Sequence, residues 1–200
     1  MYVMLYRTHQ AFGLFCTSVA LVDITHTPIF SLAGAGALAL SAFASPLPDV
    51  DQPESTIAKM VFPLAWACEL LHITHRTFTH SFVAAGLWFW LAFTFQKAHI
   101  EIAGLHLALF PILFAGGAIG YLSHIAIDML NRMGQQLFWP FPQRYAFYLV
   151  SSNGIANELS KYVFFVAFIV VAFYSLALQA PFVRAIFAAV HHAFPIFPLA

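Results

Sequence analysis

The sequence predicts an all-α fold, a polytopic membrane helix bundle with about five spans and one interfacial helix. Hydrophobic residues make up 62% of its 200 residues and charged residues only 8%. The mean hydropathy is +0.82, which is too apolar for an ordinary soluble domain of this length. Apolar stretches also recur at lengths near the roughly 20 residues that cross a hydrocarbon core. These observations place the chain in a bilayer.

The expected spans are apolar stretches with few charges, at residues 10–22, 29–45, 82–96, 103–127 and 155–179. The first and third are short, so tilt or local bilayer thinning must help them to cross. Residues 57–72 contain Lys59, Pro63 and Glu69 in an apolar background, which favours a helix lying on the membrane surface. We expect one membrane-embedded domain over residues 1–180 and an apolar C-terminal tail over 181–200.

Residues 133–153 interrupt the hydrophobic pattern with glycine, prolines and polar residues, and predict a long ordered loop or lid. Its aromatic run 138–142 suits the level of the lipid headgroups. The formal net charge is +0 and lysine and arginine form no run, so a nucleic-acid partner is not expected. Cys16 and Cys68 lie in apolar segments without metal-type spacing and are interpreted as small buried hydrophobes.

Four short stretches hold seven of the fourteen histidine and aspartate residues: residues 7–9, 48–51, 75–81 and 123–128. Aspartate and histidine are costly in hydrocarbon, so a membrane protein that gathers them usually uses them for ions, protons or catalysis. The expected order of spans brings all four stretches to one membrane face. Because most lysines and arginines fall on that face, the positive-inside rule predicts that it is cytoplasmic.

The spacing of these residues suggests individual roles. His124 and Asp128 are four residues apart and share one helical face, as metal ligands or as a hydrogen-bonded pair. Asp49 and Asp51 follow two prolines, so one carboxylate could bind a metal while the other supports a ligand; a helix cap or turn is the alternative. His75 and His80 do not share a helical face. We expect His80 to be the ligand and His75 to transfer protons or to be an interfacial histidine.

These motifs carry a resemblance to a known family. Tyr6–His9, Pro48–Asp51, His75–Ser81 and Gly120–Asp128 occur in the order found in the YdjM-type family of bacterial inner-membrane proteins, described as predicted membrane-bound metal-dependent hydrolases. Gly134 and the Trp139–Phe141 region also fit, and the resemblance covers roughly residues 6–145. It implies a multi-pass protein of the bacterial inner membrane.

That family is in turn similar to zinc-dependent phospholipase C. The resemblance implies that four residues surround one metal, while His9 and a bridging Asp128 bind another. Ligands for a third zinc are not evident, because Glu158 is the one nearby carboxylate after the loop. The four residues implied for the first metal are Asp51, His80, His124 and Asp128.

Zinc also follows from the donors, because nitrogen and carboxylate ligands without thiolate suit Zn²⁺, with Mn²⁺ or Fe²⁺ as alternatives. One or two ions are expected. Such a metal would activate a water and polarise a phosphoryl oxygen. Arg76, and Arg144 with less support, could hold the phosphate, and His75 or Asp49 could handle protons.

The sequence therefore favours a metal-dependent hydrolase of a phosphoester in a lipid or lipid-linked substrate, with membrane lipids as its surroundings. Two other classes stay open at this stage. One is an ion transporter, although the middle of the predicted spans lacks a polar relay. The other is a non-catalytic envelope protein with a structural metal.

Overall fold

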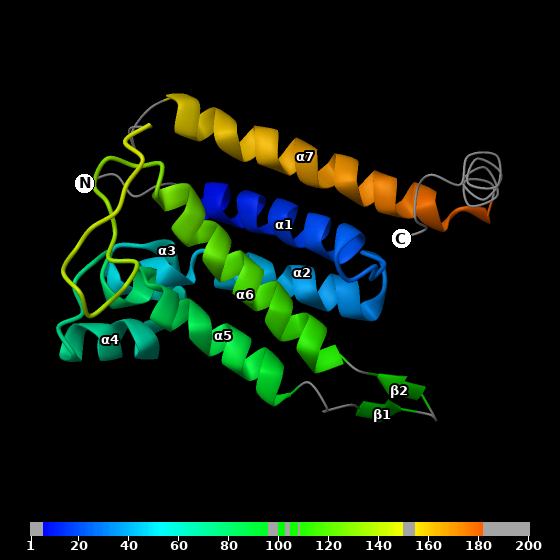
Figure 1. Cartoon of the computed structure of the whole chain (residues 1–200), viewed down its shortest axis with the longest axis horizontal. Helices are drawn as coiled ribbons and strands as arrows, with labels where there is room; N and C mark the ends of the chain where they lie inside the picture. The colour runs from blue at the N-terminus through cyan, green and yellow to red at the C-terminus, as the bar shows by residue number, and fades with distance from the viewer. Residues whose placement is uncertain (1–5, 96–99, 103–104, 108, 150–154, 182–200) are drawn as a thin grey trace.

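The computed structural model describes residues 6–95, 100–102, 105–107, 109–149 and 155–181. Helices dominate it, and the long ones lie side by side (Figure 1). In chain order the elements are α1 (Tyr6–Asp23), α2 (Leu32–Ala44), the 3-10 helix η1 (Leu47–Asp51), α3 (Thr56–Met60), α4 (Phe62–Leu70), the 3-10 helix η2 (Phe78–His80), α5 (Phe82–Thr94), β1 (Ile100–Ile102), β2 (Leu105–Leu107), α6 (Leu109–Asp128) and α7 (Ile155–Gln179).

Helix α6 is the centre of the bundle and packs against α1, α2 and α5, while α7 packs against α1. Small residues allow α6 to approach α2 closely. A Cβ atom added to Gly116 would lie 2.4 Å from the carbonyl oxygen of Ala37, and one added to Gly120 would lie 2.6 Å from that of Ser41. This is the small-residue packing expected between helices in a membrane.

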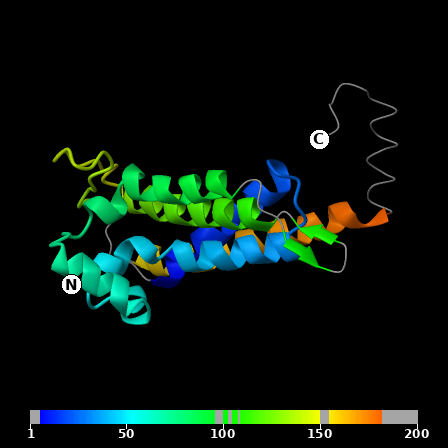
Figure 2. The ribbon, with the colours of Figure 1, turned by 90° about the horizontal axis from the view of Figure 1, so that it is seen from below.

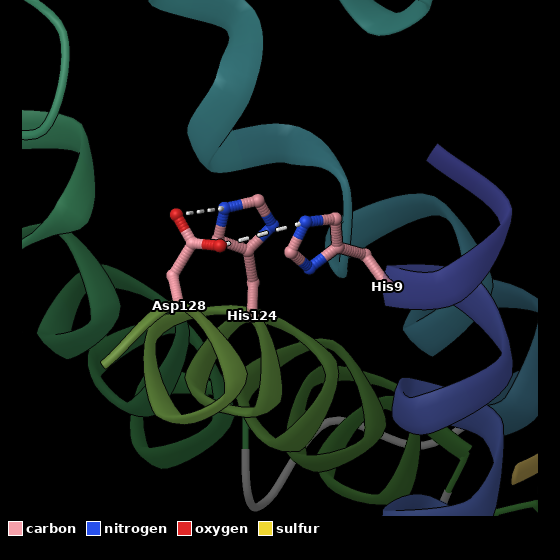
Figure 3. A group of neighbouring side chains, drawn as sticks. All are labelled: His9, His124 and Asp128. Carbon is pink, nitrogen blue, oxygen red and sulfur yellow. Dashed lines mark ion pairs between the residues drawn. The ribbon is translucent and has the colours of Figure 1, made fainter. Parts of the chain in front are cut away.

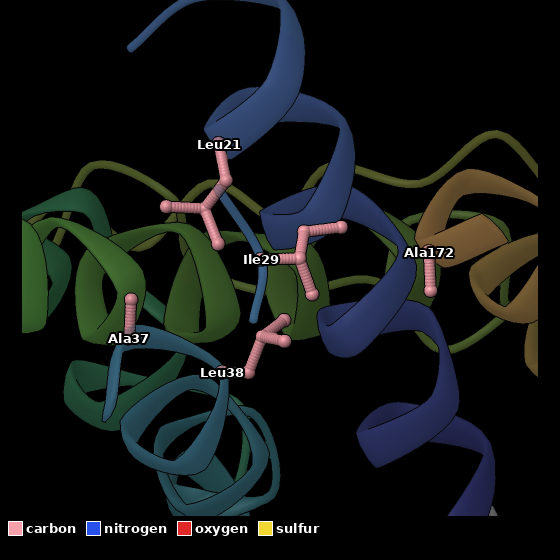
Figure 4. Close-up of a cluster of buried hydrophobic side chains, with 5 residues drawn as sticks. All are labelled: Leu21, Ile29, Ala37, Leu38 and Ala172. Carbon is pink, nitrogen blue, oxygen red and sulfur yellow. The ribbon is translucent and has the colours of Figure 1, made fainter. Parts of the chain in front are cut away.

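An apolar cluster joins three helices away from the polar motifs (Figure 4). Leu21 from α1, Leu38 from α2 and Ala172 from α7 are its buried members, together with Ala37 and with Ile29 from the α1–α2 connection. Buried apolar contacts of this kind fix the relative positions of the helices. The polar motifs lie toward the opposite end of α1, where its first turn contains His9.

Helices form in all five stretches expected to span the membrane, but the expectation of five spans is not supported. Within the described residues, α6 (Phe110–Asp128) and α7 (Glu158–Gln179) are long and apolar enough to cross a membrane. Helices α2 and α5 have 13 residues each, or about 20 Å at 1.5 Å per residue, against a core of about 30 Å. Helix α1 has 18 residues, but its first turn contains Arg7, His9 and Gln10.

Two other segments differ from the sequence prediction. The helix expected over 57–72 is broken at Val61, and α4 begins just before Pro63, whose ring cannot continue the preceding helix. The stretch 103–127 does not start as a helix, because Leu105–Leu107 pairs antiparallel with Ile100–Ile102 before α6 begins. The predicted tail lies outside the described residues after Pro181, as do residues 150–153 of the predicted loop.

The polar motifs meet at one end of the bundle. This end contains α3, α4 and the loop that follows α6, whereas the β1–β2 hairpin lies at the opposite end (Figure 2). The loop folds back on the bundle through backbone hydrogen bonds from Gln136 N to the Arg76 carbonyl and from Phe82 N to the Leu137 carbonyl, both 2.9 Å. It therefore covers the segment between α4 and α5, as a lid would.

Apolar side chains are exposed over much of the surface. Helix α7 exposes Val163, Val170 and Phe173, and α5 exposes Trp90 and Phe93. Soluble monomers rarely expose contiguous apolar surface on this scale. Exposed apolar surface of this extent suits contact with lipid or with another apolar surface.

Candidate metal centre

Histidine and aspartate side chains from four segments of the chain meet at the lid end of the bundle. His9 comes from α1, Asp49 from η1, His80 from η2 and both His124 and Asp128 from α6. The side chains of His9, His80 and His124 are fully buried, and those of Asp49 and Asp128 nearly so. A buried charged cluster of this kind is costly unless its members neutralise one another or bind an ion.

The hydrogen bonds of His124 determine which of its nitrogens faces the cluster. Its Nδ1 lies 2.7 Å from the carbonyl oxygen of Ser45. A carbonyl oxygen only accepts, so Nδ1 carries the proton and Nε2 presents a lone pair. Nε2 of His124 lies 3.2 Å from Nε2 of His80. The two imidazoles therefore direct their Nε2 atoms at the same point.

His80 is held in the same way from its far side. Its Nδ1 lies 3.1 Å from the Thr79 hydroxyl, and that hydroxyl donates to Oδ2 of Asp51. Because the hydroxyl proton is used on Asp51, the Thr79 oxygen is free to accept from His80 Nδ1. A ligand histidine commonly donates its second N–H to a polar group of this kind, which fixes its tautomer and ring orientation.

Donor atoms of Asp49, His80 and His124 lie close enough together to hold one metal ion, and Asp128 lies beside both histidines. Asp49 Oδ1 is 3.6 Å from Nε2 of both His80 and His124. Asp128 Oδ2 is 3.8 Å from His80 Nε2 and 4.0 Å from His124 Nε2. Zinc–ligand bonds of 2.0–2.1 Å imply a separation of about 3.3–3.4 Å between tetrahedral donors. The observed separations, including the 3.2 Å between the histidines, scatter around and slightly above that value.

His9 and the second oxygen of Asp128 form an adjoining pair of donors (Figure 3). Asp128 Oδ1 lies 3.8 Å from His9 Nε2, and the His9 ring stacks on that of His124 with centroids 3.8 Å apart. Within the described residues, both His9 nitrogens and Asp128 Oδ1 are buried without a hydrogen-bond partner. Buried polar atoms are normally satisfied, so His9 Nε2 and Asp128 Oδ1 fit a second ion bridged by Asp128.

Arg76 borders the same carboxylate. Its Nη2 lies 2.9 Å from Asp128 Oδ2, while Nε and Nη1 are buried with no hydrogen-bond partner in the described part of the chain. The residue has a φ of +66°, a left-handed conformation that is strained for a non-glycine residue. Each of these unused buried donors can bind an anionic oxygen, and because Nε and Nη1 point to different edges of the guanidinium, they bind separate acceptors.

Asp51 contacts the outer side of the cluster. Its Oδ1 lies 2.8 Å from His75 Nδ1, and its Oδ2 lies 3.7 Å from His80 Nδ1, the nitrogen that faces away from Asp49. The His75 side chain is 21% exposed, whereas the other histidines of the cluster are fully buried. His75 therefore connects the buried cluster to the outside.

The charges of the cluster suit a divalent cation. Three buried carboxylates, those of Asp49, Asp51 and Asp128, face one buried guanidinium, that of Arg76. With neutral histidines, two negative charges are left, which one Zn²⁺ would balance. Burial alone would raise the pKa of Asp49, but the facing histidines, His124 foremost, hold that pKa below its ordinary value. Burial acts to lower the pKa of His80, but the carboxylates of Asp49 and Asp51 outweigh it and raise that pKa.

Comparison with protein families assigns the chain. The family model described as YdjM inner membrane protein matches residues 4–189. The chain belongs to the YdjM inner membrane protein family. It is 33% identical over 126 residues to Inner membrane protein YdjM of Escherichia coli (strain K12), and likewise to that of Shigella flexneri. The aligned region covers 62% of this chain and 58% of those relatives, so the chain spans little more than half of their length.

No solved structure significantly matches the chain. The YdjM relationship supports the expected location in the inner membrane. The expected similarity to phospholipase C is not shown by these comparisons.

The structure brings all the predicted site residues of this YdjM family member into one cluster, but in an arrangement that the sequence did not specify. Asp49 faces the two Nε2 atoms, whereas Asp51 faces His75 and the far side of His80. Glu158 is not among these contacts and pairs with Lys161. Arg144 is exposed, and its Nη1 donates to the carbonyl of Gly134 at 3.5 Å.

Two supporting contacts were missed by sequence reasoning. The Ser45 carbonyl that orients His124 is a backbone group, so no residue type marks it. Thr79 lies between His75 and His80 in the sequence, and its position next to His80 was the only available signal of its contact with Asp51.

Proposed function

We propose that the protein is a membrane-bound metal-dependent hydrolase that acts on a phosphoester in a lipid or lipid-linked substrate. The observation that carries the proposal is the convergence of four buried donors beside an arginine with two unused buried donors. The four donors suit a zinc ion, and the arginine suits the phosphate of a substrate. Mn²⁺ and Fe²⁺ are alternatives for the same nitrogen and oxygen donors.

The proposed roles follow the contacts. His80, His124, Asp49 and Asp128 bind the first ion, and His9 with Asp128 Oδ1 binds the second. Asp51 orients His80 and His75, which exchanges Asp49 and Asp51 relative to the roles expected from sequence. Zinc at these positions would polarise a phosphoryl oxygen and lower the pKa of a bound water to about 7.

The chain's own groups complete the proposed reaction. Arg76 donates from Nε or Nη1 to a phosphate oxygen while Nη2 holds Asp128 in place. His75 accepts and releases protons, because its ring is both tied to Asp51 and partly exposed. The lid excludes bulk water from the buried donors, which strengthens their electrostatic interactions with the phosphate.

A structural metal is the second candidate, and one observation favours it. Up to four buried protein side chains, two histidines and two aspartates, are available at the first position, as in structural zinc sites, whereas catalytic zinc keeps an open position. In the described part of the chain, the donors that the second position adds to those of the first are His9 Nε2 and Asp128 Oδ1, so a second ion would keep open positions. We therefore assign the reactive water to the second ion.

The discriminating experiment measures bound metal and phosphoesterase turnover in the wild type, His124→Asn and His26→Asn. His26 is an exposed histidine of the α1–α2 connection and serves as the matched control. We expect His124→Asn to lose both metal and turnover, and His26→Asn to retain both. The structural role would be favoured by two results together. The wild type would bind metal but hydrolyse none of a panel of soluble and lipid phosphoesters, and His124→Asn would lose much of its thermal stability.

We further propose that α6 and α7 cross the membrane and that the metal centre faces the cytoplasm. Arg7, Lys59, Arg132, Arg144 and Lys161 all belong to elements or loops at the lid end, which is the pattern expected for a cytoplasmic face. Thiol labelling of Gln143→Cys, in a chain without its native cysteines, tests the orientation. Labelling by an impermeant reagent only in inside-out vesicles is expected, and labelling only in right-side-out vesicles would contradict the assignment.

A further inference from the structure

A pocket lies on the outer side of the turn that carries His75 and Arg76. It has a volume of about 470 Å³, within the range of about 300–1,000 Å³ that is typical of small-molecule sites. The turn from residue 74 to 77 forms one wall, with Thr74 and Thr77 lining the pocket, while Arg76 between them reaches inward to Asp128. One turn therefore separates the pocket from the donors proposed to hold a phosphate.

The lid forms another wall. Gln136 and Trp139 line the pocket, and Gln136 is tied to the turn by its backbone N–H, which donates to the Arg76 carbonyl at 2.9 Å. Trp139 packs edge to face on Phe78 with ring centroids 5.2 Å apart. The position of the lid residues is thus coupled through the backbone to the position of Arg76.

The chemistry of the lining selects the kind of group that fits. None of the lining side chains in the described part of the chain is aspartate, glutamate, lysine or arginine. The Thr77 hydroxyl donates to the Thr74 carbonyl and is left to accept, and Gln136 Nε2 donates to the Pro142 carbonyl at 3.4 Å, which leaves one N–H and the amide oxygen. The Thr74 hydroxyl and the imidazole of His72 add further polar groups, and Trp139 offers an aromatic face. With His72 neutral, such a lining can satisfy hydroxyl groups on a neutral molecule and provides no carboxylate for an ammonium.

We propose that this pocket binds a neutral, hydroxyl-bearing group attached to the substrate's phosphate, such as a glycerol or sugar headgroup. The inference rests on the proposed hydrolase function and adds the class of substrate. The phosphate lies on the Arg76 side of the turn, and the hydroxylated group lies on the Thr74 and Thr77 side. Lipids with a glycerol headgroup and prenyl-phosphate-linked sugars share this chemistry.

The test compares three short-chain lipids that differ only in the headgroup, together with one prenyl-linked sugar phosphate. Full-length, metal-loaded protein is given dioctanoylphosphatidylglycerol, dioctanoylphosphatidylethanolamine, dioctanoylphosphatidylcholine or farnesyl-phosphoryl-glucose, and binding and hydrolysis are measured separately. We expect the glycerol lipid or the sugar lipid to bind at least tenfold more tightly than the ethanolamine and choline lipids. The better of the two hydroxylated ligands identifies the source. Equal or tighter binding of the choline lipid would overturn the proposal.

Variants test the lining itself. Gln136→Leu removes the amide and is expected to weaken binding of the preferred lipid roughly threefold to tenfold, as for one net hydrogen bond, with bound metal unchanged. Gln143→Leu changes an exposed glutamine of the same lid outside the pocket lining and is the matched control. Equal effects of the two variants would contradict the assignment.

The two proposals can fail separately. If the rate of hydrolysis is the same for every headgroup and is unchanged by Gln136→Leu, the pocket proposal is refuted and the hydrolase proposal stands. Headgroup-selective binding without turnover of any substrate would refute the hydrolase and leave a binding site for hydroxylated lipids.

Discussion

Exchanging Asp49 or Asp51 for asparagine gives a matched pair of variants. Each removes one negative charge from the same short helix and keeps nearly the same shape. Asp49 Oδ1 lies 3.6 Å from both His80 Nε2 and His124 Nε2, which is the position of a direct ligand. Asp51 reaches the cluster through Thr79 and the Nδ1 side of His80, which is the position of an orienting group.

The expected magnitudes differ accordingly. Changes to groups that orient a ligand typically cost 10–100-fold in metal affinity, or about 1.4–2.7 kcal/mol. We expect Asp51→Asn to weaken zinc binding within that range, because its amide can still contact Thr79 and His75. Asp49→Asn replaces an anionic donor in a buried site by a neutral amide, and we expect a loss of more than about 100-fold, beyond that outer range.

The assay is competition for zinc against a chromogenic chelator, with purified protein in detergent at constant pH. Thermal unfolding of both variants without added metal serves as the control for folding. Weaker binding by Asp51→Asn than by Asp49→Asn would refute the assignment drawn from the structure and would restore the one drawn from the sequence.

Three further predictions concern packing, pH and phosphate. Gly116→Ala would place a Cβ atom 2.4 Å from a backbone oxygen of α2, so we expect a loss of about 1–3 kcal/mol in thermal unfolding. Gly86→Ala has open space around it and should be neutral or stabilising; equal effects would contradict the close packing. Zinc affinity should fall as the pH decreases, because protons compete for the histidines, and His80 with its raised pKa is protonated first; pH-independent binding would argue against histidine ligands. Arg76→Lys should retain zinc but raise the KM for a phosphoester about tenfold or more, through loss of the guanidinium's hydrogen bond to the phosphate, and an unchanged KM would remove Arg76 from substrate binding.

The residues singled out from the sequence lie together in the structure, and they could be singled out because histidine and aspartate are costly in an apolar chain. The spacing of His124 and Asp128 predicted that both lie on one face of a helix, and the structure has both residues near the end of α6. The choice between Asp49 and Asp51 could not be made from sequence. In a 3-10 helix bounded by prolines and glutamine, the direction of each carboxylate depends on how η1 packs against η2 and α4, and these contacts are between segments distant in the sequence.

The fold was predicted less completely, for a physical reason. Apolar stretches at 29–45 and 82–96 indicated helices, and helices are present, but hydrophobicity does not report where a helix ends. Ser31 caps α2 by accepting from the N–H of Gly34, so α2 begins at Leu32 and not at residue 29. Helix α5 begins at the predicted residue, after the Ser81 cap, and ends at Thr94, so each helix has 13 residues. The apolar pattern around residues 103–108 likewise did not distinguish the short hairpin from the start of α6.

The most direct test of the account is X-ray absorption at the zinc edge of the purified, zinc-loaded protein. The account predicts stoichiometric zinc with only nitrogen and oxygen neighbours at about 2.0–2.1 Å and with the outer-shell scattering of two or three imidazoles. A spectrum containing sulfur at about 2.3 Å, or protein that retains no zinc after dialysis at neutral pH, would contradict it.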